Sequence, residues 1–206
     1  MEHFNNGLDF ILWPSESHKR LNAKVPSLIP MVIFVGVFDV LIFESILNDH
    51  LLKGGSALKI LLAILAAVLI GLVDVLCFAW PIADLCRYIA RRTEKFITPG
   101  FHIILMKSYA LSHVVLIPYL LLTTQFGDQP AIIRPDFSSY GLLTIIVDLW
   151  QLAILMRTIS VKSKLEFPAK LIPAVGMYFW ISFQGYALWY LLQLVYNLMG
   201  SLDKIL

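Results

Sequence analysis

The chain has 206 residues, of which 59% are hydrophobic and 15% are charged, and its mean hydropathy is +0.78. Soluble domains are typically about 45–50% apolar and about 25% charged. The apolar residues occur in long runs, which indicates an integral membrane protein and excludes a soluble globular enzyme and a disordered chain. The net charge of +2 is too small for the phosphate contacts of a nucleic-acid-binding protein.

Residues 1–27 are predicted to form a cytoplasmic or interfacial segment ahead of the first span. Residues 1–7 contain no Lys or Arg, and the apolar piece 8–13 is short and contains Asp9. This pattern does not fit a cleavable signal peptide, which needs a basic start and a longer apolar core. The apolar residues before Pro14 instead fit a foot in the membrane interface, with Trp13 at the level of the headgroups.

Five apolar segments have the length of about 20 residues that a membrane span needs. They are too long for barrel strands of about 9–11 alternating residues, and in lipid the backbone must satisfy its own hydrogen bonds, so helices are expected. We therefore predict an all-α polytopic membrane protein, with a single domain of five transmembrane helices over 28–198 and a tail at 199–206. The predicted spans are 28–48, 57–80, 101–123, 140–160 and 171–198.

Turn and breaker residues separate these spans. Gly54–Ser56 predicts a tight turn after the first span, and the stretch 126–139 predicts a longer polar loop. Pro118 is expected to kink the third span near its far end, and Pro168 and Pro173 precede or open the fifth. The sequence shows no internal repeat, so it gives no support to an inverted-repeat transporter.

The basic residues are distributed unevenly between the two sides of the predicted bundle. Eleven fall on one side and four on the other, while Lys107 lies within a span. Because basic residues concentrate in cytoplasmic loops, the N-terminus is predicted to be cytoplasmic and the C-terminus outside or lumenal. The richer side holds Lys19, Arg20, Lys24, Arg87, Arg91, Arg92, Lys95, Arg157, Lys162, Lys164 and Lys170; the other holds Lys53, Lys59, Arg134 and Lys204.

The stretch 81–100 on the richer side combines basic residues with apolar ones. This pattern predicts a short amphipathic helix lying on the inner leaflet, where each basic residue would attract anionic lipid by about 1 kcal/mol. Two interpretations stay open: a topology signal alone, or a specific site for anionic lipid or for a partner. The basic residues are Arg87, Arg91, Arg92 and Lys95, with Tyr88, Ile89 and Phe96 as apolar companions.

Ionisable residues inside the predicted spans are the main functional candidates, because each costs roughly 2.5–3.5 kcal/mol to insert. Asp74 and Lys107 each lie about six residues from the same end of two consecutive antiparallel spans, so an intramembrane ion pair is predicted. Asp39, His113 and Asp148 are predicted to lie near the midplane, where they could hold a proton or a cation. The alternative is that each of them only caps a polar group of a neighbouring helix.

Other chemistry has little support in the sequence. H-E-x-x-H and G-x-S-x-G motifs and phosphate-binding glycine loops are missing, so no catalytic residue, metal site or cofactor is predicted. Cys77 and Cys86 are nine residues apart and fit two unpaired thiols. Ala63, Ala67 and Gly71 form a small-residue stripe, which lets another helix approach closely, either within the chain or in a dimer.

The arrangement resembles the Yip1 domain family over about residues 8–198. The resemblance rests on Trp13–Pro14, the five predicted spans and the stretch from Lys107 through Tyr109–Leu111 to Pro118. Trp150 in the fourth span and the proline-led fifth span also fit. The acidic and Tyr-Gly motifs of the longer eukaryotic N-terminal regions are missing, which implies a compact prokaryotic-type member. The family is non-enzymatic; eukaryotic members act with small GTPases in vesicle trafficking, and some bacterial members accompany ABC exporters.

Two functional hypotheses follow. The first is a non-enzymatic scaffold or accessory subunit that acts through anionic lipid and a partner membrane protein, without nucleic acid. The second is a small proton- or cation-coupled transporter or channel component that uses Asp39, His113 and Asp148. Because a pore through one chain of 206 residues is implausible, the second hypothesis requires a homo-oligomer. In both cases we expect a multi-pass protein of a bacterial cell membrane.

Overall fold

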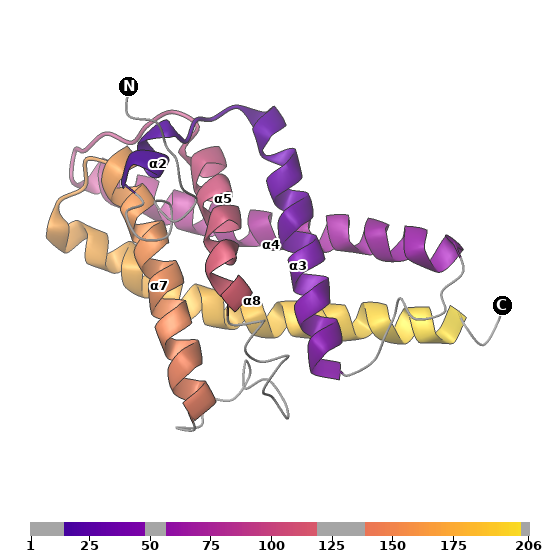
Figure 1. Ribbon diagram of the computed structural model, residues 1–206. Helices are drawn as coiled ribbons and strands as arrows, with labels where there is room; N and C mark the ends of the chain where they lie inside the picture. Colours follow the sequence, from indigo (N-terminus) through magenta and orange to yellow (C-terminus); the bar gives the residue numbers. More distant parts are fainter. Residues whose placement is uncertain (1–14, 48–56, 119–138, 203–206) are drawn as a thin grey trace.

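The computed structural model describes residues 15–47, 57–118 and 139–202 (Figure 1). Three predicted features lie outside these residues: the interfacial Trp13–Pro14, the turn at Gly54–Ser56 and all but the end of the loop 126–139. Within them the regular secondary structure is helical, joined by short loops, with a single bridge between Ile97 and Ser163. The long helices are α3 (Ile29–Leu47), α4 (Ala57–Arg92), α5 (Phe101–Ser112), α7 (Ser139–Lys162) and α8 (Phe167–Leu202), and the short ones are α2 (Ser15–Arg20), η1 (Val25–Ser27) and η2 (His113–Val115).

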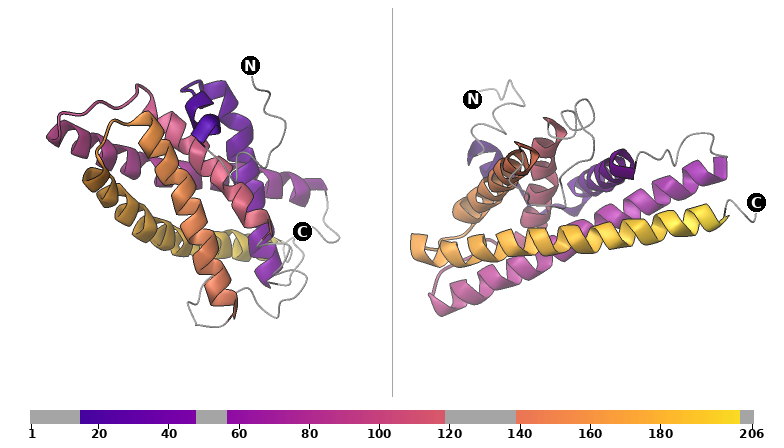
Figure 2. Two further views of the ribbon diagram at one scale, coloured as in Figure 1. Left: turned by 60° about the vertical axis from the view of Figure 1, so that its left-hand side comes forward. Right: turned by 90° about the horizontal axis from the view of Figure 1, so that it is seen from below.

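The helices form two layers. α4 and α8, each 36 residues long, pack against each other and make one layer. α3, α5 and α7 cross the same face of that layer, with α5 between the other two (Figures 1 and 2). α5 contacts α3, α4 and α7, so its side chains are buried at most positions. This makes α5 the centre of the fold.

Four helical segments of the described residues are long and apolar enough to cross a membrane: Val25–Ile42, Ile60–Arg92, Phe101–Pro118 and Phe167–Val195. The chain is therefore an all-helical protein of the membrane class. The predicted span at 140–160 coincides with α7, which is not among these four. The total of five spans and the direction in which the chain crosses the membrane stay predictions.

Helix α4 corrects the predicted boundary at residue 80. The helix continues through Pro81 to Arg92, so 81–100 contains no separate amphipathic helix. A proline inside a helix leaves the carbonyl four residues earlier without its usual donor, here that of Cys77. The indole Nε1 of Trp180 in α8 donates to this carbonyl at 2.9 Å and so supplies the missing hydrogen bond. The helix therefore continues past Pro81 with the support of a tertiary contact.

The small-residue stripe of α4 packs against α3. A Cβ on Gly36 would lie 1.7 Å from the backbone oxygen of Ala67, and a Cβ on Gly71 would lie 2.3 Å from that of Val32. Backbones this close require glycine on both helices. Of the two roles considered for the stripe, Ala67 and Gly71 serve packing within the chain.

The ends of α4 and α7 and the beginnings of α5 and α8 lie around one end of the molecule (Figure 1), and the segments that meet there carry most of the basic residues of the predicted cytoplasmic side. Residues 18–27, which we call the N-terminal clasp, are bound there by α5 and α7. Lys162 Nζ donates to the backbone oxygens of Lys19 and Leu21, both at 2.8 Å. Lys107 Nζ donates to the backbone oxygen of Asn22 at 2.8 Å. The clasp thereby closes over the ends of α5 and α7.

Candidate functional site

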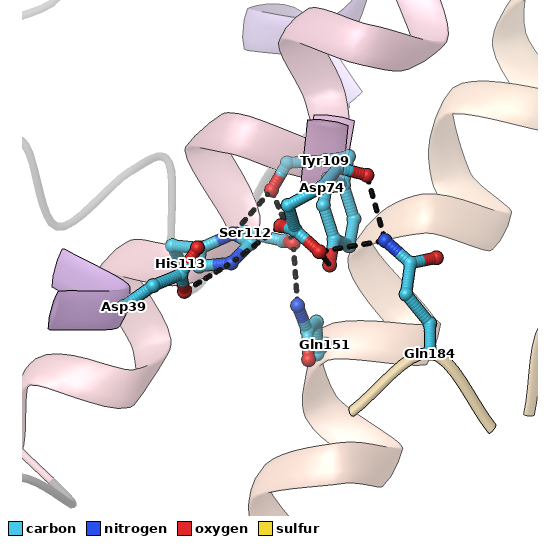
Figure 3. Close-up of polar contacts among 7 residues, drawn as sticks. All are labelled: Asp39, Asp74, Tyr109, Ser112, His113, Gln151 and Gln184. Atoms are coloured by element: carbon cyan, nitrogen blue, oxygen red, sulfur yellow. Dashed lines mark hydrogen bonds and ion pairs between the residues drawn. The ribbon is translucent and has the colours of Figure 1, made fainter. Parts of the chain in front are cut away.

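Three ionisable side chains meet where α3, α4 and the end of α5 come together (Figure 3). Asp39 comes from α3, Asp74 from α4, and His113 from the first residue of η2. One ligand atom of each lies within 4.8 Å of those of the other two. Their residues are 8%, 2% and 3% exposed. We call this group the Asp–Asp–His cluster.

The glycine contact between α3 and α4 positions the two carboxylates. Asp39 follows Gly36 by three residues, and Asp74 follows Gly71 by three. Residues three apart lie on nearly the same face of a helix, about one turn further along. Because the two glycines meet at the helix contact, both carboxylates lie close beside it. The aspartates are therefore brought together by backbone packing.

His113 is oriented by its own helix. Its Nδ1 lies 2.9 Å from the backbone oxygen of Tyr109, which can only accept, so Nδ1 carries the hydrogen. In the neutral ring the lone pair is then on Nε2. This atom lies 3.7 Å from Asp74 Oδ2 and 4.0 Å from Asp39 Oδ1. The ring of Tyr109 packs edge-on against the imidazole, with centroids 4.7 Å apart, and fixes its position further.

Asp74 is held at one oxygen and left open at the other. Tyr109 Oη donates to its Oδ1 at 3.2 Å. Gln184 Nε2 of α8 donates to the same oxygen and to the backbone oxygen of Asp74, both at 2.6 Å. Oδ2 has no hydrogen-bond partner among the described residues, and neither has Oδ2 of Asp39. Two buried carboxylates thus each present an unpaired oxygen.

Helix α7 supports the cluster indirectly. Gln151 Nε2 donates to Ser112 Oγ at 3.1 Å, and this hydroxyl donates to the backbone oxygen of Tyr109 at 2.7 Å. That oxygen is also the acceptor for His113. Figure 3 shows this second group of polar side chains beside the cluster. Helix α7 is thus linked to the cluster through the backbone oxygen of Tyr109.

The structure brings together only two of the three residues predicted for the midplane site. Asp39 and His113 are close, whereas Asp148 is half-buried on α7 and lies outside the cluster. α7 buries Val147 and Gln151, and Asp148 is about 100° around the helix from Val147. Asp148 was predicted at the same depth in the membrane as Asp39 and His113, but its helix does not turn it toward them.

The predicted ion pair between Asp74 and Lys107 is wrong. Lys107 Nζ donates to the backbone oxygen of Asn22, to Asn22 Oδ1 at 3.1 Å and to Ser27 Oγ at 2.6 Å. Tyr109, two residues later, faces Asp74. Two residues correspond to about 200° around a helix, so Lys107 points away from Asp74. The lysine binds the clasp, whereas the aspartate belongs to the cluster.

The residues of the predicted lipid-binding segment contact other protein groups in part. Arg87 pairs with Asp84 at 3.0 Å, and Lys95 pairs with Glu166 at 2.7 Å. The guanidinium of Arg92 lies 5.3 Å from the ring centroid of Tyr88. The pKa of Glu166 is lowered because Lys95 donates a hydrogen bond to its carboxylate and attracts its charge. Contact of this segment with anionic lipid stays a prediction.

Sequence reasoning missed that Asp74 joins the cluster and that Tyr109 and Gln184 hold it. One signal for the first was present. Both α3 and α4 carry Gly-x-x-Asp, at 36–39 and at 71–74. A glycine that permits close helix contact, followed one turn later by a carboxylate, predicts that the two aspartates meet if the helices cross there. No comparable pattern indicates Gln184.

Comparison with family models, with curated proteins and with solved structures finds no match for this chain. Fold and site together define the class: a helical membrane protein with a buried Asp–Asp–His cluster between its helices. The resemblance to the Yip1 domain family stays a prediction.

Proposed function

We propose that the protein is a small membrane transport component in which Asp39, Asp74 and His113 bind a cation within the membrane. The observation that carries this proposal is the pair of buried carboxylates with unpaired oxygens. Among the described residues no Lys or Arg forms an ion pair with either of them. Uncompensated ionisable groups in a span are costly and mark ion pathways. A cation that enters and leaves would compensate them for part of a transport cycle.

The cluster favours transport over the scaffold role that the Yip1 resemblance implies. A scaffold needs a stable core and surfaces for partners, and apolar residues at positions 39 and 74 would provide the core at lower cost. The basic residues where α4 and α7 end, and the predicted contacts of these residues with anionic lipid, are compatible with both roles. The cluster is therefore the feature that distinguishes them.

A route across the membrane needs more protein than one chain of this size. We propose that the protein works as a homo-oligomer, in a bacterial cell membrane and with its N-terminus on the cytoplasmic side. The four apolar helical segments support insertion in a membrane. No cofactor or catalytic residue forms part of the proposal.

Flux through purified protein in liposomes tests the proposal. Uptake of protons and of divalent cations is followed with trapped fluorescent indicators for wild type, Asp39→Asn and Asp74→Asn. We expect wild type to move at least one cation faster than protein-free liposomes. Both variants should lose most of this flux, because each removes one of the two charges that attract the cation.

Asp148→Asn is the matched control, since it removes a half-buried carboxylate of a neighbouring helix outside the cluster. It should keep its flux, and all four proteins should elute as single peaks with equal helicity. Wild-type liposomes without cation flux would overturn the proposal. So would equal flux in Asp39→Asn and wild type.

A further inference from the structure

We infer that the Asp–Asp–His cluster binds a divalent transition-metal ion of the zinc class. This inference rests on the proposed function, because it names the cation which that function leaves open. The charges point to a divalent ion. Two carboxylates and a neutral imidazole carry a formal charge of −2, and one divalent cation neutralises it completely. A monovalent cation would leave a net negative charge in a buried site, where isolated charge is strongly disfavoured.

The donor atoms select the class of metal. Mg²⁺ and Ca²⁺ are bound by oxygen, whereas a mixed set of imidazole nitrogen and carboxylate oxygen suits zinc and its neighbours in the first transition row. The imidazole of His113 presents Nε2 to both aspartates, because its Nδ1 is committed to the backbone oxygen of Tyr109. A histidine fixed in this way is the usual metal ligand.

The environment of Asp74 adds a second, independent observation. Tyr109 and Gln184 both donate to Oδ1, which turns Oδ2 toward His113. This oxygen is buried without a hydrogen-bond partner among the described residues, as is Oδ2 of Asp39. A carboxylate fixed at one oxygen and open at the other is arranged for monodentate binding. The cluster therefore has the oriented ligands and supporting hydrogen bonds of a metal site.

The distances allow a metal ion after a small adjustment. Zinc bonds of about 2.0–2.2 Å place ligand atoms of a tetrahedron about 3.4 Å apart. The Nε2 atom of His113 lies 3.7 Å and 4.0 Å from its two carboxylate oxygens, and all three ligand atoms lie within 4.8 Å of one another. Rotation of the Asp39 side chain can close the remaining gap. Three protein ligands leave one position open, which suits an ion that has to leave again.

Metal binding by the full-length protein in detergent tests the inference. After chelator treatment, Zn²⁺ is titrated by calorimetry, and Co²⁺ is titrated as a spectroscopic probe of the ligand geometry. We expect one ion per chain, with visible cobalt bands typical of four-coordinate nitrogen and oxygen ligation. A large excess of Mg²⁺ or Ca²⁺ should not displace the bound ion.

Variants assign the ion to the cluster. Asp39→Asn and His113→Gln should weaken Zn²⁺ binding more than about 100-fold, and Tyr109→Phe, which changes only a supporting donor, by about 10–100-fold. Asp148→Asn should bind like wild type. Because a ligand variant could fail to fold, each is first checked for helicity and a single elution peak. The cobalt spectrum of wild type reports the ligation without any variant.

The outcomes separate the inference from the proposed function. Zn²⁺ binding at the cluster without flux in liposomes would overturn the transport function and leave the metal site in place. Proton flux that is lost in Asp39→Asn, from a protein that binds neither Zn²⁺ nor Co²⁺, would overturn the metal site and leave the transport function. Zn²⁺ binding that is unchanged in both Asp39→Asn and His113→Gln would also overturn the inference.

Discussion

The two lysines that bind the N-terminal clasp and the two aspartates of the Asp–Asp–His cluster are all at least partly buried, but their polar atoms are satisfied to different degrees. At the clasp, Lys107 of α5 has three acceptors at 2.6–3.1 Å and Lys162 of α7 has two at 2.8 Å. In the cluster, Asp39 and Asp74 each retain an oxygen without a hydrogen-bond partner among the described residues. The two lysines at the clasp are hydrogen-bonded by other groups of the chain, whereas each aspartate of the cluster keeps one oxygen available to a ligand.

This difference shows how a structural charge can be told from a functional one. Buried polar groups in folded proteins are nearly always hydrogen-bonded, so a lysine with all its donors used needs no further explanation. A buried carboxylate with an unused oxygen costs stability and persists where a function requires it. Four predictions break or sharpen this comparison, and those that expect a change come in order of decreasing effect.

The largest effect is expected where the cluster depends on helix packing. Gly36→Ala places a Cβ against the backbone of α4 and should lower the free energy of unfolding by about 3 kcal/mol or more. Gly185→Ala in α8 is the matched control, because its Cβ meets no atom within 4 Å. The control should change the free energy by no more than about 1 kcal/mol. Unfolding in mixed detergent and SDS, followed by circular dichroism, measures both; equal stability of the two variants would contradict the close contact.

An intermediate effect is expected in the clasp. Lys107→Met removes the three hydrogen bonds by which this buried ammonium holds the exposed residues Asn22 and Ser27, which should lower the free energy of unfolding by about 1–3 kcal/mol. Backbone amides of residues 18–27 should then exchange hydrogen faster, as measured by mass spectrometry. Lys164→Met, at an exposed position of the same end, should change neither quantity.

The same variant tests whether the two regions are separate. Zn²⁺ affinity should be equal in Lys107→Met and wild type, because Lys107 faces away from Asp74. A changed Zn²⁺ affinity, with unchanged hydrogen exchange of residues 18–27, would show that Lys107 interacts with Asp74 as the sequence predicted. The clasp and the cluster would then not be separate regions.

The smallest effect concerns pH. Burial and the positive charges of Arg157 and Lys162 lower the pKa of His18 from 6.5 to about 4. The folded clasp therefore resists protonation, while a released clasp takes up a proton near pH 6.5. The contribution of His18 to the stability of the docked clasp is therefore fully present above pH 6.5 and declines as the pH falls from 6.5 toward 4. Neutral His18 also shares a hydrogen bond of 2.6 Å with Thr158.

Hydrogen exchange of residues 18–27 at pH 7.5 and pH 5, corrected for the intrinsic rates, measures this effect. Wild type should lose protection at pH 5, and His18→Gln should show the same protection at both values. His102→Gln should keep the wild-type response, because His102 contacts Arg87 and lies outside the clasp. A response that persists in His18→Gln would assign the pH dependence to another group.

Much of the fold could be predicted from local pattern. The long apolar runs predict the helices α3, α4, α5, α7 and α8 within a few residues of most ends, because lipid leaves the backbone little choice except a helix. The end of α4 was missed by twelve residues, since Pro81 looks like a boundary and the indole of Trp180 cannot be anticipated from its sequence position.

The site could be predicted only in part. Composition and hydropathy marked Asp39, Asp74 and His113 as costly residues inside apolar segments, because insertion energy depends on residue type and depth alone. The sequence by itself thus determined the class of protein and the candidate ionisable groups. Only the tertiary structure decided that Asp74 joins Asp39 and His113 while Asp148 and Lys107 do not. Contacts depend on the rotation of each helix about its axis, and that rotation is set by packing such as the contact between Gly36 and Gly71.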